Sequence, residues 1–226
     1  MCTVLKDLKM VSTCALALLI SITLPGAASY PSGPPLSSCT DMFPVGHGSN
    51  AQNANGSQPP FSITVNSTVY HANDVIQVNL SSTQPWFFEG VFIQARSANC
   101  SNPMKDSPIG TFRTIVGEKL LSPINCLEKA SSAIAHNQEL NLTNIMFYWI
   151  APSGSVGDVY LRGTFARNKA LFWTNVFSGY IADASLTNLT KERCTPPAMT
   201  SQKTGNGNTL VISLSAIFLS LLFSFL

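Results

Sequence analysis

The feature that most limits what this chain can fold into is a two-residue alternation of apolar and polar side chains along its middle part. Ile63 and Val65 alternate with polar neighbours, and the pattern recurs at 76–80 and 91–95. Because side chains two positions apart lie on the same face of a strand, this alternation predicts half-buried strands. Further runs rich in aromatic and β-branched residues, also typical of strands, span 109–116, 145–150, 159–167 and 171–177.

Turn-forming residues separate these runs. Gly, Pro, Asn, Asp and Ser concentrate at 71–74, 81–85, 102–103 and 152–154. About seven or eight short strands at this spacing, with no convincing helix between them, predict an all-β fold, namely an antiparallel β-sandwich. The segment 126–140 stays open between a short helical turn and a loop.

The N-terminus has the order of a cleavable signal peptide. Lys6 and Lys9 precede an apolar run over 10–24, then Pro25-Gly26 and the small residues 27–29. We therefore expect a signal peptide over 1–29 and a mature chain that begins near Tyr30. A retained membrane anchor is the alternative.

The C-terminus predicts a membrane attachment. The last seventeen residues, 210–226, carry no charge, and as a helix they rise about 26 Å, slightly less than the roughly 30 Å hydrocarbon core. A polar stalk over 195–208 precedes this hydrophobic tail, 209–226. The tail is either a signal for a glycosylphosphatidylinositol (GPI) anchor or a retained transmembrane segment. Candidate attachment residues for a GPI anchor are Ser201, Gly205 and Asn206.

The cysteines agree with export to an oxidising compartment. Cys2 and Cys14 leave with the signal peptide, so the mature chain keeps Cys39, Cys100, Cys126 and Cys194. Four cysteines in a secreted domain predict two disulfides, with three possible connectivities.

Asn-x-Ser/Thr sequons predict surface glycans. They begin at Asn55, Asn66, Asn79, Asn99, Asn141 and Asn188. Asn99 is the least certain glycan acceptor, because the middle residue of its sequon, Cys100, is also expected to form a disulfide. The signal peptide, tail, disulfides and sequons together predict a protein of the secretory pathway that reaches the cell surface, on the outer leaflet of the plasma membrane, with secretion or shedding as the alternative.

No arrangement typical of catalysis or metal binding occurs. Ser131, Ser132 and His136 lie close in sequence, but the chain has no GxSxG motif, and its carboxylates are scattered. There is no CxxC, and His47, His71 and His136 stand apart from one another and from the cysteines. We therefore expect no catalytic, cofactor-binding or metal-binding residues.

The charge and the tryptophans narrow the partner classes. The formal net charge of only +2, spread without basic runs, argues against a nucleic-acid partner. Trp149 and Trp173 are expected in the core, while Trp86, which follows Pro85, could pack in the core or stack on a ligand.

A series of ordered short motifs resembles the reeler (reelin-type) domain. The motifs are Tyr30-Pro31-x-Gly33, Cys39 with Met42, Pro44 and His47, GVFIQAR at 90–96, PIGTF at 108–112, Cys126, SAIAH at 132–136, WIAP at 149–152 and Phe172-Trp173. The resemblance covers about 30–183. It implies a reeler domain over 30–194 with an immunoglobulin- or fibronectin-like sandwich. It also implies pairing of Cys39 with Cys126, which leaves Cys100 for Cys194.

The resemblance also suggests functions. Reeler domains occur in reelin and spondins, in small insect defence proteins, and at the N-terminus of ferric-chelate reductases. In those reductases the activity is expected in a haem-bearing transmembrane part that this chain lacks, so we do not transfer it.

We expect a non-enzymatic cell-surface recognition module. Its partner would be an extracellular protein or glycan, and the C-terminal tail would contact the membrane. The alternatives are a secreted or shed innate-defence protein that binds microbial surfaces, and an accessory or truncated relative of the reductases.

Overall fold

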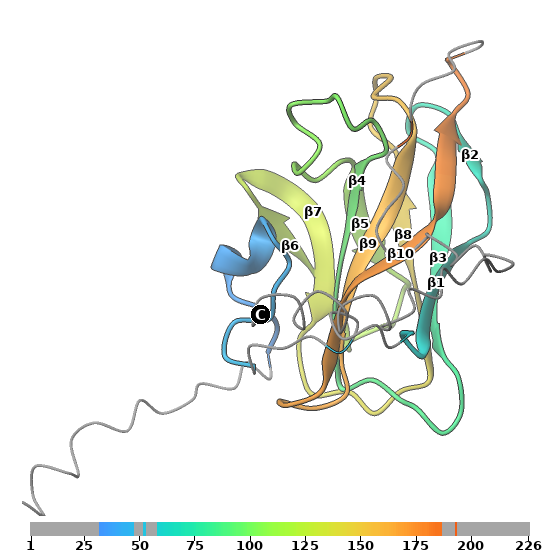
Figure 1. The fold of residues 1–226 in the computed structure, drawn as a ribbon. Coiled ribbons are helices and arrows are strands. Elements are labelled where there is room, and N and C mark those ends of the chain that lie inside the picture. The colour runs from blue at the N-terminus through green and yellow to red at the C-terminus, as the bar shows by residue number, and fades with distance from the viewer. Residues whose placement is uncertain (1–31, 48–51, 53–57, 187–192, 194–226) are drawn as a thin grey trace, which may run out of the picture.

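The computed structural model describes residues 32–47, 52, 58–186 and 193, and this part of the chain is all β (Figure 1). A 3-10 helix, η1 (Leu36–Cys39), precedes the strands. The strands are β1 (Phe61–Val65), β2 (Val69–Tyr70), β3 (Val75–Ser82), β4 (Gly90–Ser97), β5 (Thr111–Thr114), β6 (Leu121–Cys126), β7 (Lys129–His136), β8 (Asn144–Ile150), β9 (Val159–Ala166) and β10 (Phe172–Asp183).

The strands form two sheets that pack as a sandwich (Figure 1). One sheet has the order β1-β3-β8-β5, and the other has the order β2-β10-β9-β4-β7-β6. The pairs are antiparallel except β2 with β10, which is parallel. The all-β class predicted from alternation is therefore confirmed, with one mixed sheet.

The described residues hold ten strands, more than the seven or eight expected. The segment left open, 126–140, contains β7, which pairs with β4 and with β6. β7 is rich in Ala and Ser, so it lacks the β-branched signal of a strand. β6 contains Pro123, which is tolerated because β6 is an edge strand.

The core lies between the sheets and follows the alternation. Ile76, Val78 and Leu80 of β3 point inward and are at most 2% exposed. Trp149 and Trp173 are buried, as predicted. Trp86 is half-buried and meets Trp173 edge to face, with 5.4 Å between ring centroids, so it belongs to the margin of the core.

One strand departs from the alternation. Every residue of β4 is buried, although the sequence predicted a half-buried strand. Its outward side is covered by the N-terminal arm, residues 32–47, which forms a second apolar cluster with the six-stranded sheet. A disulfide between Cys39 and Cys126 fixes the arm, with a Cα–Cα distance of 5.4 Å, so the pairing implied by the resemblance is confirmed.

The second disulfide is partly described. Cys100 is disulfide-bonded, and the neighbouring residue Asn99 forms an isolated bridge with Arg193. Cys194 lies outside the described residues, so its pairing with Cys100 stays a prediction.

Several other predicted features also lie outside the described residues. They are the signal peptide 1–29, the stalk 195–208, the tail 209–226, Asn55, Asn188, Ser201, Gly205 and Asn206. Across the described ranges, no helix has the length and apolar character needed to cross a membrane.

Candidate functional site

The arm is held on the six-stranded sheet by hydrogen bonds to four consecutive backbone carbonyls, those of residues 39–42. Such carbonyls at the end of a helical turn lack partners within the turn. The donors come from the outward side chains of β4 and β9, at 2.6 to 3.1 Å: Gln94, Arg96, Arg162 and Thr164. The arm is thus fixed by side-chain hydrogen bonds as well as by its disulfide.

Arg96 is a buried cation within this contact. Its side chain is 1% exposed, and one guanidinium nitrogen, Nη2, donates to the carbonyls of Cys39 and Thr40. Burial, followed by repulsion from nearby Arg162, lowers the pKa of Arg96 to about 10. Arg96 therefore stays charged at neutral pH and serves to anchor the arm.

A mainly apolar pocket lies between the arm and the six-stranded sheet. Its empty volume is about 390 Å³, including space open to solvent, at the small end of ligand pockets. The lining comes from the arm, the start of β4, and the ends of β7 and β9: Gly33, Pro34, Pro35, Met42, Pro44, Val45, His47, Gly90, Val91, Phe92, His136, Thr164 and Ala166.

His136 lies against Gly90 in this pocket. Its Nδ1 is 3.1 Å from the backbone nitrogen and 3.0 Å from the carbonyl oxygen of Val91. A Cβ on Gly90 would lie 3.0 Å from His136 Cε1, so the ring's position depends on glycine there. Gly33 has φ +108°, and a Cβ on it would come within 2.8 Å of the His136 carbonyl oxygen.

His47 contributes the second imidazole of the pocket. Its ring meets Phe172 edge to face at 5.6 Å. Burial is the main cause that lowers the pKa of His47 below its ordinary value, and backbone hydrogen bonds at Asn168 and Lys169 oppose it. The ring is therefore neutral at pH 7, and its buried Nδ1 has no hydrogen-bond partner.

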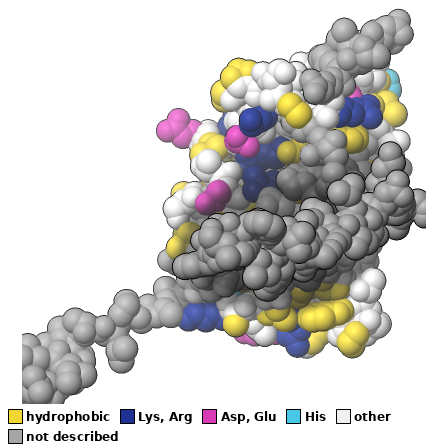
Figure 2. All heavy atoms as spheres, in the orientation of Figure 1, with side chains coloured by type: hydrophobic (Ala, Val, Ile, Leu, Met, Phe, Trp, Pro, Cys, Tyr) yellow, Lys and Arg dark blue, Asp and Glu magenta, His cyan; other side chains and the backbone are white. Residues whose placement is uncertain are grey.

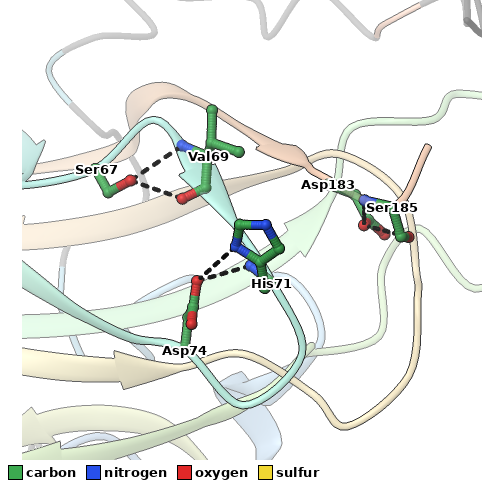
Figure 3. A network of polar contacts seen from close by, with 6 residues as sticks. All are labelled: Ser67, Val69, His71, Asp74, Asp183 and Ser185. Carbon is green, nitrogen blue, oxygen red and sulfur yellow. Dashed lines mark hydrogen bonds and ion pairs between the residues drawn. The ribbon is translucent and has the colours of Figure 1, made fainter. Parts of the chain in front are cut away.

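The sequence did not bring these two histidines together. His47 and His136 were interpreted there as isolated residues, and the topology places both in the lining of one pocket. The available signal was that each belongs to a motif of the reeler resemblance. His71 lies elsewhere, in an exposed turn with its Nδ1 3.3 Å from Asp74 Oδ2 (Figure 3).

The serines near His136 serve backbone hydrogen bonds. Ser132 is fully buried, and its Oγ accepts a hydrogen bond from the Cys126 nitrogen and lies 2.8 Å from the carbonyl oxygen of Lys129 and 3.1 Å from that of Cys126, either of which can take its single proton. Within the described ranges, no group of three or more His, Cys, Asp or Glu side chains could hold a metal ion. No catalytic arrangement is evident in the described part of the chain.

The described sequons belong mainly to the four-stranded sheet. Asn66 follows β1, Asn79 lies in β3, and Asn141 precedes β8. Asn66 and Asn141 are exposed and Asn79 is half-buried. Asn79 Oδ1 accepts a hydrogen bond from Asn144 Nδ2, which leaves the Asn79 side-chain nitrogen for a glycan. Asn99 follows β4, and glycan occupancy at all four stays a prediction.

The surface in the orientation of Figure 2 shows basic, acidic and hydrophobic side chains interspersed on one face.

Comparison with known proteins decides the family. The family model for the reeler domain matches residues 37–188. The chain belongs to the reeler family. The motifs from which the sequence predicted this family lie mostly within that match.

Several relatives show what the domain is similar to. Ferric-chelate reductase 1 of Bos taurus is 31% identical over 150 residues, which cover 66% of this chain and 23% of the reductase. A Danio rerio relative of the same reductase is 33% identical over 154 residues, covering 68% of this chain and 25% of that protein. The chain thus spans about a quarter of the length of these relatives.

Other relatives are nearly spanned by this chain. A Bombyx mori protein provisionally named as a defense protein is 29% identical over 172 residues, covering 74% of this chain and 94% of that protein. Among solved structures, the human F-spondin reeler domain is 22% identical, with a TM-score of 0.47, and the match covers 56% of this chain and 91% of that one.

Proposed function

We propose that this protein is a non-enzymatic recognition module of the cell surface whose binding site is the pocket between the arm and the six-stranded sheet. The observation that carries the proposal is a small apolar pocket with rigid walls. The disulfide at Cys39 and the hydrogen bonds to carbonyls 39–42 fix one wall, and β4 is the other. A site fixed before binding loses less conformational entropy when a partner binds.

The placement of the sequons supports this choice of surface. Asn66, Asn79 and Asn141 belong to the four-stranded sheet and its adjoining turns. Glycans at these positions would shield the outer face of that sheet. The pocket lies on the other sheet, where it would remain accessible.

The direction of β4 gives a second supporting argument. The pocket includes Gly90 at the start of β4, while Asn99 pairs with Arg193 just beyond its end. These ends are roughly 23 Å apart at about 3.3 Å per residue. If the chain after Arg193 leads to the membrane, the pocket faces away from it and toward partners outside the cell.

A glycan-wedge experiment tests the proposal. Leu36 is exposed on the arm beside Pro35, and L36N creates a sequon with Ser37 and Ser38. S62N creates a matched sequon with Thr64 on the exposed side of β1. Full-length protein would be incorporated into fluorescent vesicles, and binding to a panel of cell types would be measured by cytometry.

We expect the glycan at position 36 to reduce cell binding at least tenfold, because it is attached next to Pro35, which lines the pocket. The glycan at position 62 should leave binding unchanged. Equal binding by both glycosylated variants would place the site elsewhere, and no binding by the unmodified protein to any cell type would count against a recognition role.

The insect relative favours a second candidate function, recognition of microbial surfaces, because this chain spans 94% of that protein. The same vesicles would be tested against bacteria and fungal wall polysaccharides. Selective binding that L36N abolishes would support defence, while binding only to animal cells would favour the first candidate.

A further inference from the structure

The hydrogen bonds of His47 determine which of its ring nitrogens carries the proton. Its backbone hydrogen bonds at Asn168 and Lys169 raise the pKa of the ring, so the imidazole is the donor in them. Nδ1 has no hydrogen-bond partner, and the donating nitrogen is therefore Nε2. In the neutral ring Nδ1 then carries a lone pair and acts as a hydrogen-bond acceptor.

The other polar side chains of the pocket lining are already engaged. The Thr164 hydroxyl donates to the carbonyl oxygen of Met42 at 2.6 Å. His136 Nδ1 lies 3.1 Å from the backbone nitrogen of Val91 and 3.0 Å from its carbonyl oxygen. Among the lining residues, the buried side-chain atom that lacks a partner is His47 Nδ1. Because an unmatched buried acceptor is costly, the pocket favours a ligand that brings a donor.

The composition of the lining excludes a charged ligand. None of its thirteen residues is Asp, Glu, Lys or Arg. A charged group that entered would lose its water without gaining an opposite charge, which is unfavourable. A sugar ring is disfavoured for a related reason, because its several hydroxyl groups would each need a partner that these side chains do not offer.

The walls of the pocket suit a flat apolar ring. Met42 and Phe92 are at most 4% exposed, and three proline rings, those of Pro34, Pro35 and Pro44, complete the apolar surface. The empty volume of about 390 Å³, part of it open to solvent, accommodates one side chain of aromatic size. Tyrosine and tryptophan each combine such a ring with a single hydrogen-bond donor at its edge.

We propose that the pocket takes a tyrosine or tryptophan side chain presented by a protein partner, with the ring against the apolar walls and its O–H or N–H donating to His47 Nδ1. This inference rests on the proposed function, because it names the partner class of the same site, a protein rather than a glycan. Tyrosine and tryptophan are also enriched among the residues that contribute most of the binding energy at protein interfaces.

Uncharged analogues of single side chains test the inference without knowledge of the partner. Full-length protein in lipid nanodiscs, labelled with ¹³C at the methionine methyl groups and at His Cε1, would be titrated by NMR. The probes are N-acetyl-tyrosinamide, N-acetyl-tryptophanamide, N-acetyl-phenylalaninamide and methyl α-mannoside. H47F removes the acceptor and keeps an aromatic ring, and H71F, in the exposed turn before β3, is the matched control.

The tyrosine and tryptophan probes should shift the Met42 and His47 signals and bind about five- to tenfold more tightly than the phenylalanine probe, the factor expected for one hydrogen bond. In H47F this preference should disappear, while the phenylalanine probe binds as it does to the native protein. H71F should keep the preference. The mannoside should leave the signals of the pocket unchanged.

Equal affinity of the native protein for the tyrosine and phenylalanine probes would overturn the inference, and this comparison holds even if H47F does not fold. Loss of the preference in H71F, shifts of the pocket signals by the mannoside, or no shift with any aromatic probe would overturn it as well. The cell-binding assay is independent of these outcomes. Probe selectivity without cell binding would keep the inference and reject the recognition role, whereas cell binding abolished by L36N without probe selectivity would do the reverse.

Discussion

At the residue scale, the site depends on glycines as much as on its larger side chains. Gly90 and Gly33 each lie against His136, one at its ring and the other at its carbonyl. The contact with Gly90 positions the imidazole of His136, the last residue of β7, against the start of β4. Substitution of Gly90 should therefore change the position of the His136 ring in the pocket.

Replacing Gly90 with Ala should displace the His136 ring, because the new Cβ would lie 3.0 Å from Cε1 and 3.3 Å from Nε2. We expect a loss of about 1–3 kcal/mol in the free energy of unfolding, measured by denaturant titration, and a changed His136 NMR signal. G179A is the control, since a Cβ at Gly179 meets nothing within 4 Å. Equal losses in both variants would contradict the prediction.

At the element scale, one carboxylate joins the end of β10 to the strand and loop beside it. Asp183 accepts hydrogen bonds from the Tyr70 hydroxyl of β2 and from Ser155 and Gly157 of the loop before β9. Ser185 also donates to it, from its backbone nitrogen and its hydroxyl (Figure 3). Desolvation raises the pKa of Asp183, but these hydrogen bonds outweigh it and bring the pKa well below its ordinary value.

This lowered pKa predicts the pH dependence of stability. The ionised Asp183 stabilises the fold at pH values above the ordinary carboxyl pKa of about 3.9, and that stabilisation is lost as the pH falls through the lower folded-state pKa. D183N should therefore cost about 2 kcal/mol at pH 7, and the difference should shrink below about pH 4. Thermal melts from pH 2 to 7 measure it. A difference that stays constant with pH would reject the role of the charge.

The alternation of apolar and polar residues predicted the positions of strands better than it predicted which strand faces are covered by other parts of the chain. It located β1, β3 and β4, whose core-facing residues alternate along the strand. It missed β2, which has only two residues, and left β7 open. It could not show that β4 is buried on both sides, because the arm that covers β4 is distant in sequence and has no periodicity of its own.

The candidate site was harder to predict from the sequence than the strands were, because its residues are also distant from one another along the chain. The pairing of Cys39 with Cys126 came from the family resemblance, and the structure confirms it. The placement of His47 and His136 in the lining of one pocket depends on the packing of the arm on the six-stranded sheet and on the order β9-β4-β7. Neither is a matter of local spacing, so the pocket could be found only once the fold was known.

At the scale of the whole molecule, the predicted attachment to the membrane would determine how the pocket is presented. Arg193, the last described residue, pairs with Asn99 and forms an ion pair with Asp158. Arg193 therefore lies near the end of β4, away from Gly90 at its start. A stalk of fourteen residues, 195–208, would then separate this end from the lipid.

The hydrophobic tail predicts release of the protein by a lipid-specific enzyme. Residues 210–226 carry no charge and are slightly short for a membrane span, which favours replacement by a GPI anchor. Phosphatidylinositol-specific phospholipase C should therefore release the protein from intact expressing cells. Mass analysis of the released chain should find the lipid remnant on Ser201, Gly205 or Asn206.

The matched control appends Lys-Lys-Arg after Leu226, which favours a retained transmembrane helix and should reduce release. Resistance of the unmodified protein, with the 210–226 peptide still attached, would instead establish a transmembrane segment.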